Sequence, residues 1–197
     1  DGHEPRTVSY EYNGPGGRLS KVTLSPGDHW GSITYSATDP NLITQTESKV
    51  DGETTRKSYF EYSDGKLSAY RNPRSTSSSD DTYKSTIAYN SGSTIVSSPQ
   101  VSNYVGSPGV RLSTKYVFSS DGKGHTTDIY SGVNPDGSGG LGRISYAWNK
   151  CHQVTKVTDY QDLTTPLGSV SYVYDGKGNA SKVEGQLPDA QTAVSTA

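Results

Sequence analysis

Apolar and polar residues alternate in short runs along this chain, and the alternation predicts β-strands. Val8, Tyr10 and Tyr12 fall on one side of an extended segment, whereas Ser9 and Glu11 fall on the other. Gly, Pro, Asn and Asp separate runs of this kind, and no segment of about a dozen residues keeps a helical period. The pattern therefore predicts an all-β protein with almost no helix.

The predicted strands come in pairs that repeat along the sequence. Each unit consists of an aromatic residue, one spacer, a second aromatic residue, a turn and a returning strand. The second aromatic residue is the anchor of its unit, and over the six intervals between positions 12 and 174 the anchors are on average 27 residues apart. A period of this length indicates a repeat architecture. The seven anchors are Tyr12, Tyr35, Tyr62, Tyr89, Phe118, Trp148 and Tyr174.

The turns carry Asx-Gly dipeptides, which favour type I′ hairpins because both central residues of such a turn need a positive φ. These dipeptides are Asn13-Gly14, Asp64-Gly65, Asp121-Gly122 and Asp175-Gly176.

The returning strands carry apolar residues three positions apart, as Leu67 and Tyr70 are. Strict alternation would place such a pair on opposite faces of the sheet. One extra residue, a β-bulge, would return both to the same face and bend the strand. A bulge in every unit predicts a curled, solenoid-like strip of about seven antiparallel β-hairpins, with Tyr and apolar side chains on the inner side.

Residues 1–185 are expected to form one domain of about seven repeats. The segment 186–197 is polar and small, and is expected to be a tail or the start of a further repeat. Residues 74–81, 99–109 and 135–142 interrupt the repeat as loops rich in Ser, Gly and Pro.

The composition suits a sheet with few aliphatic residues. Hydrophobic residues are only 29% of the chain, and Tyr supplies 15 of its aromatic residues. The net charge of −2 and the lack of a basic cluster argue against nucleic acid as a partner. The sequence shows no transmembrane stretch and no signal peptide. Because there is no Met, a mature product or an excised piece of a longer chain is expected.

The repeated unit resembles the YD repeat, also called the RHS repeat. Its pattern is Tyr-x-Tyr-Asx, then Gly, a basic residue and Leu, then Val. The resemblance spans roughly residues 8–185, and its best copies are Tyr10-Glu-Tyr12-Asn13 with Gly17-Arg18-Leu19 and Val22-Thr23, Tyr59-Phe-Glu-Tyr62 with Gly65-Lys66-Leu67, and Tyr172-Val-Tyr174-Asp175 with Gly178-Asn179 and Val183. The units around Tyr35, Tyr89 and Phe118 match poorly.

The resemblance implies a β-strip of the kind that spirals into hollow shells in bacterial RHS proteins, toxin complexes and teneurins. Repeats of related wall-associated proteins are linked to carbohydrate binding. This chain departs from the family in two ways. The family's shells contain many more than seven repeats, and the conserved end-of-shell segment with its self-cleavage site is missing. Only a faint similarity to that segment occurs at Asn134-Pro-Asp-Gly137.

Few residues suggest catalysis or metal binding. Cys151-His152 lies in a hairpin turn where other units carry Gly or Asn, so surface turn residues are the simpler interpretation. His3, His29 and His125 are scattered over polar segments. The carboxylate pairs Asp80/Asp81 and Asp159/Asp162 do not imply a shared site. We therefore predict no catalytic, cofactor-binding or metal-binding residues, and no enzyme.

The aromatic residues carry the remaining functional hypotheses. Anchor side chains are expected to form the core of the sheet, with Tyr12, Tyr62, Trp148 and Tyr174 mostly buried on one face, although Tyr and Trp rings also stack on sugars. Trp30 lies outside the motif and is the best candidate for a surface contact. The leading hypothesis is a structural segment of a secreted or surface bacterial repeat protein, a shell wall or rigid scaffold whose partners are further repeats or copies of itself. The alternatives are a module that binds cell-surface carbohydrate and a self-assembling filament subunit.

Overall fold

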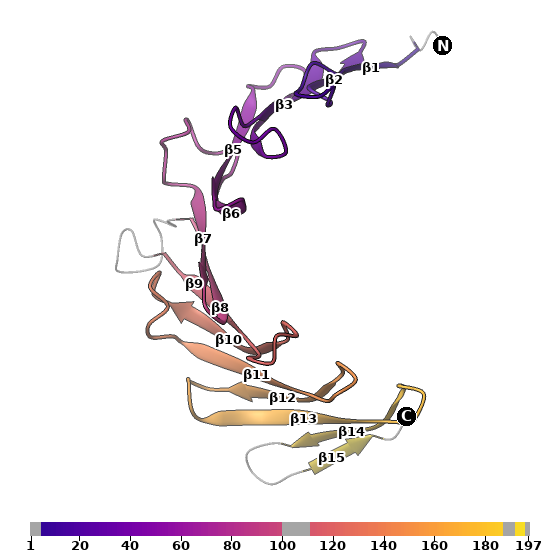
Figure 1. Cartoon of the computed structure of the whole chain (residues 1–197), viewed down its shortest axis with the longest axis vertical. Coiled ribbons are helices and arrows are strands. Elements are labelled where there is room, and N and C mark those ends of the chain that lie inside the picture. The colour runs from indigo at the N-terminus through magenta and orange to yellow at the C-terminus, as the bar shows by residue number, and fades with distance from the viewer. Residues whose placement is uncertain (1–4, 100–110, 187–191, 196–197) are drawn as a thin grey trace. The chain divides into compact units, whose positions relative to one another are not determined.

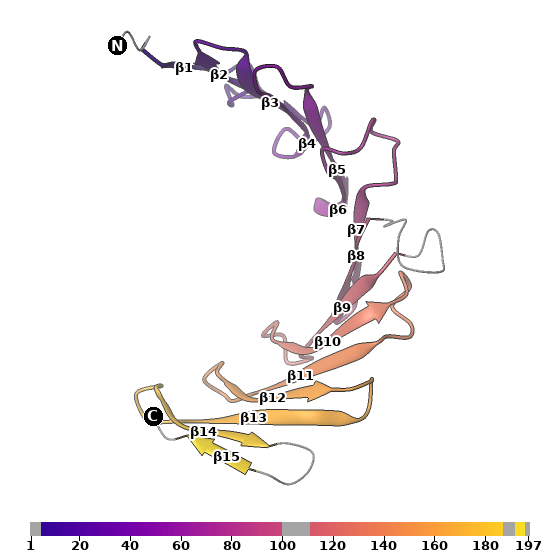
Figure 2. The same cartoon turned by 180° about the vertical axis from the view of Figure 1, so that it is seen from behind.

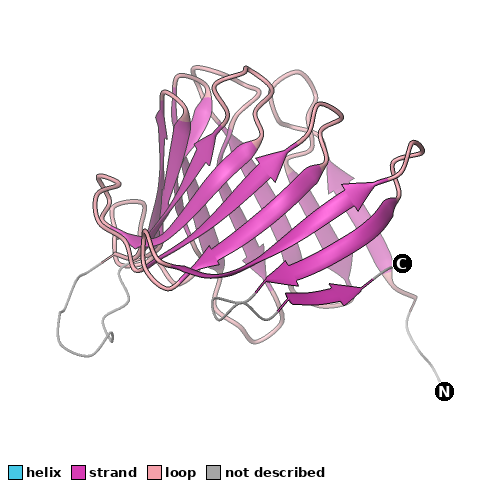
Figure 3. Ribbon diagram, turned by 90° about the horizontal axis from the view of Figure 1, so that it is seen from below, coloured by secondary structure: helices cyan, strands magenta, loops and turns pink. Residues whose placement is uncertain are grey.

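The computed structural model describes residues 5–99, 111–186 and 192–195, and these residues form strands and turns without a helix (Figure 3). The all-β prediction is confirmed. The chain divides into two compact units. The first contains residues 1–86 and 99–110, and the second contains residues 87–98 and 111–197. Most of the loop expected at 99–109 lies outside the described residues.

The first unit is an antiparallel meander in which each strand pairs with the next one in the sequence (Figure 1). Its strands are β1 (Thr7–Glu11), β2 (Lys21–Ser25), β3 (His29–Tyr35), β4 (Ile43–Lys49), β5 (Arg56–Ser63) and β6 (Lys66–Arg71). Strand β7 (Lys84–Asn90) begins in this unit, where Lys84, Ser85 and Thr86 pair with β6.

The second unit repeats this arrangement (Figure 2). It contains the rest of β7, followed by β8 (Ser93–Ser97), β9 (Ser113–Phe118), β10 (Thr126–Val133), β11 (Gly142–Trp148), β12 (Val154–Tyr160), β13 (Pro166–Tyr174), β14 (Ala180–Gln186) and β15 (Thr192–Ser195). From β8 to β15 every neighbouring pair is antiparallel. Strand β15 lies within the segment expected to be a tail or the start of a further repeat.

The predicted bulge is confirmed in five hairpins. Tyr62 pairs with Leu67, but the preceding Glu61 pairs with Ala69, so Ser68 is the extra residue on the returning strand. The same shift precedes four other anchors, Tyr35, Phe118, Trp148 and Tyr174. The extra residues in these hairpins are Thr44, Thr127, Thr155 and Ser181.

All five extra residues are Ser or Thr, a feature that the sequence pattern contained but that the predictions missed. The hydroxyl of Thr44, Thr127 or Ser181 donates to the carbonyl of the residue before its anchor, at 3.2 to 3.4 Å. In the first hairpin, the Ser20 hydroxyl makes the same bond to Glu11 at 3.0 Å. A bulge interrupts the ladder of backbone hydrogen bonds, and the hydroxyl supplies a donor at the interruption.

We expect Ser20→Ala to lower the free energy of unfolding by about 1 kcal/mol. The Ser20 hydroxyl donates to Glu11 and also accepts the Asn13 N–H at 3.1 Å, so the substitution removes both bonds. Urea unfolding measures the change. Ser9→Ala on exposed β1 is the control, because the structure assigns no bond to that hydroxyl. Equal stability of the two variants would contradict a role for the hydroxyl at the bulge.

The predicted turn type holds at only one position. Asp64 and Gly65 both have positive φ, 51° and 71°, as a type I′ turn requires. In the hairpin after Asn13 the positive φ values instead fall on Gly16 and Gly17, and in the hairpin after Asp175 on Gly178. These turns are longer than a two-residue type I′ turn. In the turn after Asp175, the Gly178 N–H donates to the Asp175 carbonyl, and the Asp175 N–H donates to the Asn179 carbonyl. The Asp175 carboxylate satisfies further loop N–H groups, so the Asx residue acts through its side chain.

Register and alternation assign the side chains of each unit to two faces. The anchor face of a unit is the face that carries its anchor side chains, and the opposite face carries most of the charges. On the anchor face of the first unit lie Val22, Leu24, Gly31, Ile33, Tyr35, Phe60, Tyr62 and Tyr70. On that of the second unit lie Ile129, Ile144, Tyr146, Trp148, Val157, Val170, Tyr172, Tyr174 and Val183.

The interior of the protein is small. Ala69, Ile95 and Val133 are the hydrophobic residues that are fully buried among those described. Most apolar side chains, including five of the anchors, are half-buried. The expectation that Tyr12 would be mostly buried is wrong, since it is 60% exposed, and Tyr89 is also exposed. Tyr12 belongs to the first hairpin and has no preceding hairpin among the described residues to cover its ring.

Candidate functional site

Four of the anchor side chains connect their hairpin to the one before it. The Tyr62 hydroxyl donates to the Ile43 carbonyl at 2.8 Å, and Ile43 is the residue paired with the preceding anchor, Tyr35. The Tyr174 hydroxyl bonds Val154, which pairs with Trp148, at 2.7 Å.

Two further anchors follow the same rule. The indole N–H of Trp148 bonds the carbonyl of Thr126, the partner of Phe118, at 2.8 Å. The Tyr35 hydroxyl bonds Leu19 in the first hairpin, also at 2.8 Å. The ladder is therefore a set of polar clamps between consecutive repeats as well as a stack of rings. This accounts for the polar-tipped aromatic residue, Tyr or Trp, at six of the seven anchors, whereas Phe118 has no donor for such a bond.

Trp30 lies on the face opposite the anchors. It pairs with Thr23 on β2 and with Lys49 on β4, and the Lys21 ammonium lies 5.8 Å from its ring centroid. The indole is half-buried. A flat aromatic ring among hydroxyl and ammonium groups is the arrangement that carbohydrate-binding surfaces use, because the ring stacks on a sugar and polar groups bond its hydroxyls.

A groove of about 280 Å³ lies in the same region of the first unit. Most of its lining belongs to the anchor face, where Gly31 contributes no side chain. The lining residues are Val22, Leu24, His29, Trp30, Gly31, Ser48, Lys49 and Val50. Side-chain contacts hold its rim, between His29 Nε2 and the Asp51 carboxylate at 3.0 Å and between the Lys49 ammonium and the Asp28 carboxylate. Because the Trp30 side chain alternates to the other face, this apolar groove and the Trp30 ring are two separate surfaces.

Arg71 is the centre of a charge network on the opposite face of the first unit. Its side chain is 5% exposed, and its guanidinium contacts Glu61 and, at 2.7 Å, Asp81. Lys84 reaches Glu61 at 3.1 Å. Partial burial disfavours the charge on Glu61, but hydrogen bonds from Arg71 and Lys84 outweigh it and lower the pKa of that carboxyl. The network holds β5, β6 and β7 together.

A second arginine has a similar role in the second unit. Arg143 pairs directly with Tyr130 and Tyr160, and its guanidinium lies 5.6 and 4.7 Å from the centroids of their rings. It also bonds Asp128, at 2.6 and 2.8 Å. Cation–π contacts on both sides and a carboxylate partner make this arginine structural.

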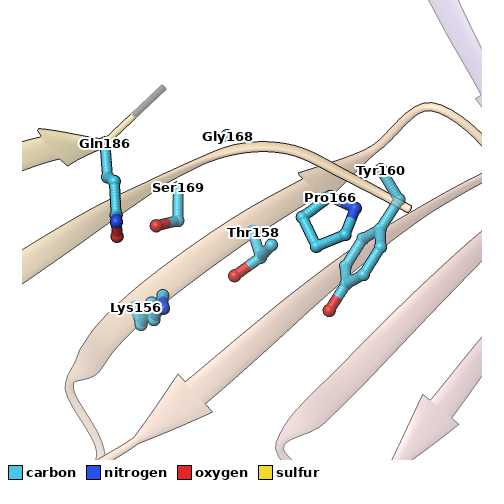
Figure 4. Close-up of a pocket in the computed structure, with 7 residues that line it drawn as sticks. All are labelled: Lys156, Thr158, Tyr160, Pro166, Gly168, Ser169 and Gln186. Carbon is cyan, nitrogen blue, oxygen red and sulfur yellow. The ribbon is translucent and has the colours of Figure 1, made fainter. Parts of the chain in front are cut away.

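Next to Arg143, a polar groove of about 330 Å³ crosses β12, β13 and β14 (Figure 4). Its lining residues are Lys156, Thr158, Tyr160, Pro166, Gly168, Ser169 and Gln186. Lys156, Thr158 and Tyr160 alternate along one strand and share a face. The ring of Tyr160 already contacts Arg143, so the groove offers hydroxyl, amide and ammonium groups but no unoccupied aromatic platform.

Cys151 and His152 occupy the predicted turn, and the structure brings His125 to them. His152 Nδ1 lies 2.7 Å from His125 Nε2, although the two residues are 27 positions apart. The His125 ring stacks on the Trp148 indole at 4.6 Å and 8°. Cys151 is exposed. The separation of the two histidines equals the mean repeat period, a signal that places them in neighbouring units but does not by itself predict their contact.

His152 has a φ of 63° at the position where the equivalent turn of the last hairpin has Gly178. We expect His152→Gly to raise the free energy of unfolding by about 1 kcal/mol, because a side chain in the left-handed region costs roughly this much. Thermal or urea unfolding tests the gain, and Lys150→Gly in the same turn is the control, which should not stabilise. A less stable His152→Gly protein would show that the His125 contact outweighs the backbone strain.

The acidic pairs noted in the sequence do not form paired-carboxylate sites. Asp80 accepts bonds from the N–H groups of Thr76 and Thr82, and Asp81 contacts Arg71. Asp162 accepts the N–H groups of Thr164 and Thr165 at 2.7 and 2.8 Å. These backbone hydrogen bonds lower the pKa of Asp80 and of Asp162 to about 2. Each carboxylate therefore stabilises its own loop.

We expect the carboxyl group of Asp162 to titrate near pH 2 in an NMR experiment. Because its folded-state pKa lies below the usual 3.8, its contribution to stability is fully present above that pH and is lost as the pH falls towards 2. Unfolding of an Asp162→Asn variant should be less pH-dependent over this interval. A titration near 3.8 would contradict the loop hydrogen bonds.

Among the described residues, no three His, Cys, Asp or Glu side chains converge in a metal-binding group, and no helix has the length and apolar character to cross a membrane. The sequence matches no protein-family model, and comparison with curated proteins gives no match.

Proposed function

We propose that this chain is a structural repeat segment of a secreted or surface bacterial protein of the YD/RHS type. Its hairpins would stack into a shell wall or a rigid extracellular scaffold, as a curled solenoid of about seven repeats. The observation that carries the proposal is the recurrent clamp from an anchor to the preceding hairpin, which four of the seven anchors make, at Tyr35, Tyr62, Trp148 and Tyr174. A clamp that recurs at the same position of the repeated unit can be extended by adding units.

The proposal assigns a role to the outer edge of β1. The Glu11 carbonyl accepts the Ser20 N–H, so the backbone groups of Glu11 and Ser9 face β2. Those of Val8 and Tyr10 therefore point away from β2, where no strand pairs with them among the described residues. An edge of this kind pairs with another strand. Further repeats of a parent chain, or a second copy of this chain, would supply the strand that pairs with this edge.

Amide exchange and sedimentation at several concentrations test this role. We expect the Val8 and Tyr10 amides to exchange fast in the monomer and to become protected on association. Val8→Pro removes one outward N–H without removing a bond to β2, and should weaken any association by about tenfold. Val8→Ala keeps the N–H and is the control. Val8 and Tyr10 amides that are protected in a monomer at every concentration would overturn the proposal, since the edge would already be covered. A self-associating chain would favour the filament alternative.

Carbohydrate binding is the second candidate function, and the environment of Trp30 favours it. The ring lies beside Thr23, Lys21 and Lys49 on a face that bears charged and hydroxyl groups. A glycan array with wild-type protein and Trp30→Ala tests it, with Trp148→Phe as the matched control in the other unit. Binding that survives Trp30→Ala, or no binding at all, would contradict this function.

A further inference from the structure

The strongest unassigned cluster lies where two hairpin turns of the second unit meet. His125 follows the turn between β9 and β10, and His152 belongs to the turn between β11 and β12. Their nitrogens Nε2 and Nδ1 are 2.7 Å apart, and the two rings are inclined by 62°. Neutral imidazole nitrogens are the commonest metal ligands in proteins. At this distance the two nitrogens either share one proton or bind one ion.

We propose that His125 and His152 form a two-histidine site for a divalent transition-metal ion of the nickel and copper class. With metal–nitrogen bonds of about 2.05 Å, two ligands at a right angle are about 2.9 Å apart, whereas two ligands at a tetrahedral angle are about 3.3 Å apart. The two nitrogens, 2.7 Å apart, are closer than either arrangement requires, so His152 must turn to admit an ion, and the right-angled arrangement needs the smaller turn. Square and tetragonal nitrogen sites select Cu²⁺ or Ni²⁺ over Zn²⁺.

One ligand of the pair is held in place by its surroundings. The His125 ring stacks on the Trp148 indole, and that indole is itself fixed by its bond to the Thr126 carbonyl. His152 is exposed, so its ring can turn until both nitrogens point to the ion, and water can occupy the remaining positions. The turn keeps His152 near His125, because the His152 N–H donates to the Asn149 carbonyl at 3.2 Å.

The bound ion would connect two consecutive hairpins outside the sheet. The anchor clamp of Trp148 already connects the same hairpins through the backbone of β10. A metal bridge between their turns adds a side-chain connection that depends on the ion. The site thus goes beyond the proposed structural role, since it makes the stability of this part of the strip responsive to metal.

Nickel titration of the whole chain tests the site, with Ni²⁺ alone as the probe. All proteins carry His3→Ala and Cys151→Ser, so that neither a histidine near the chain terminus nor the exposed thiol contributes ligands. Equilibrium dialysis gives the stoichiometry. Fluorescence locates the ion, because an ion on His125 lies against Trp148 and should quench it, whereas Trp30 belongs to the other unit.

We expect one Ni²⁺ per chain in this background, and a loss of affinity of at least about tenfold in His152→Gly and in His125→Ala. His152→Gly is the decisive variant, because it removes the ligand and also relieves the positive φ, so a folding defect does not explain its loss. His29→Ala, in the first unit, should bind as the background does. The proposed site would be overturned if the background protein does not saturate at millimolar Ni²⁺, or if His152→Gly binds Ni²⁺ as tightly as the background protein does. It would also be overturned if Ni²⁺ binds only after Cys151 is restored.

Discussion

Tyr62→Ala should lower the free energy of unfolding by about 3 kcal/mol. The substitution removes a half-buried ring from the anchor face, and it also removes the donor that bonds the Ile43 carbonyl at 2.8 Å. The ring accounts for most of the loss, because truncating a large aromatic side chain leaves a cavity and exposes its neighbours. Urea unfolding of the whole chain measures the change.

Two controls separate the contributions at this position. Tyr62→Phe keeps the ring and removes only the hydroxyl, so it should cost about 1 kcal/mol. Tyr12→Ala makes the same truncation at the same position of the motif, but Tyr12 is 60% exposed, and a change within about 0.5 kcal/mol is expected. Equal losses for Tyr62→Ala and Tyr12→Ala would show that burial against the preceding hairpin does not stabilise the anchors.

The parts of the fold that the sequence predicted are those that follow from local periodicity. Leu67 and Tyr70 are three positions apart, and this spacing predicted the bulge that Ser68 forms. The position of Trp30 on the face opposite Tyr35 was contained in the alternation, since the two positions differ by an odd number, but the predictions did not use it. Antiparallel pairing followed from the short turns between strands.

Other features depend on contacts between repeats, which periodicity does not describe. The exposure of Tyr12 follows from its place in the first hairpin, whereas the motif treats all anchors alike. The hydroxyl at each bulge was visible as a recurrent Ser or Thr, but its role requires the register. The contact between His125 and His152 joins turns of different lengths, so their separation of one period was necessary but not sufficient to predict it.

Replacing Arg71 by Met should cost about 2 kcal/mol. Removing one partner from a fully buried ion pair costs roughly 3–5 kcal/mol, because the other charge remains buried without a partner. Here the guanidinium is buried, but Glu61 and Asp81 are 43% and 58% exposed, so water can solvate them once the arginine is gone. The loss is therefore smaller than in a closed interior. Met retains much of the volume of the arginine stem, so the change reports mainly on the charges.

Arg56→Met is the matched control for this experiment. Arg56 contacts Glu53 at 3.6 Å with both side chains more than half exposed, and such a pair contributes less than about 0.5 kcal/mol. The pH dependence provides a second test. The pKa of Glu61 is lowered in the folded protein, so its pairing stabilises above the usual value of 4.5 and is lost as the pH falls through the folded-state pKa. The difference between wild type and Arg71→Met should therefore shrink on acidification. If the difference stays constant in acid, Arg71 stabilises the sheet through packing alone and not through its carboxylate partners.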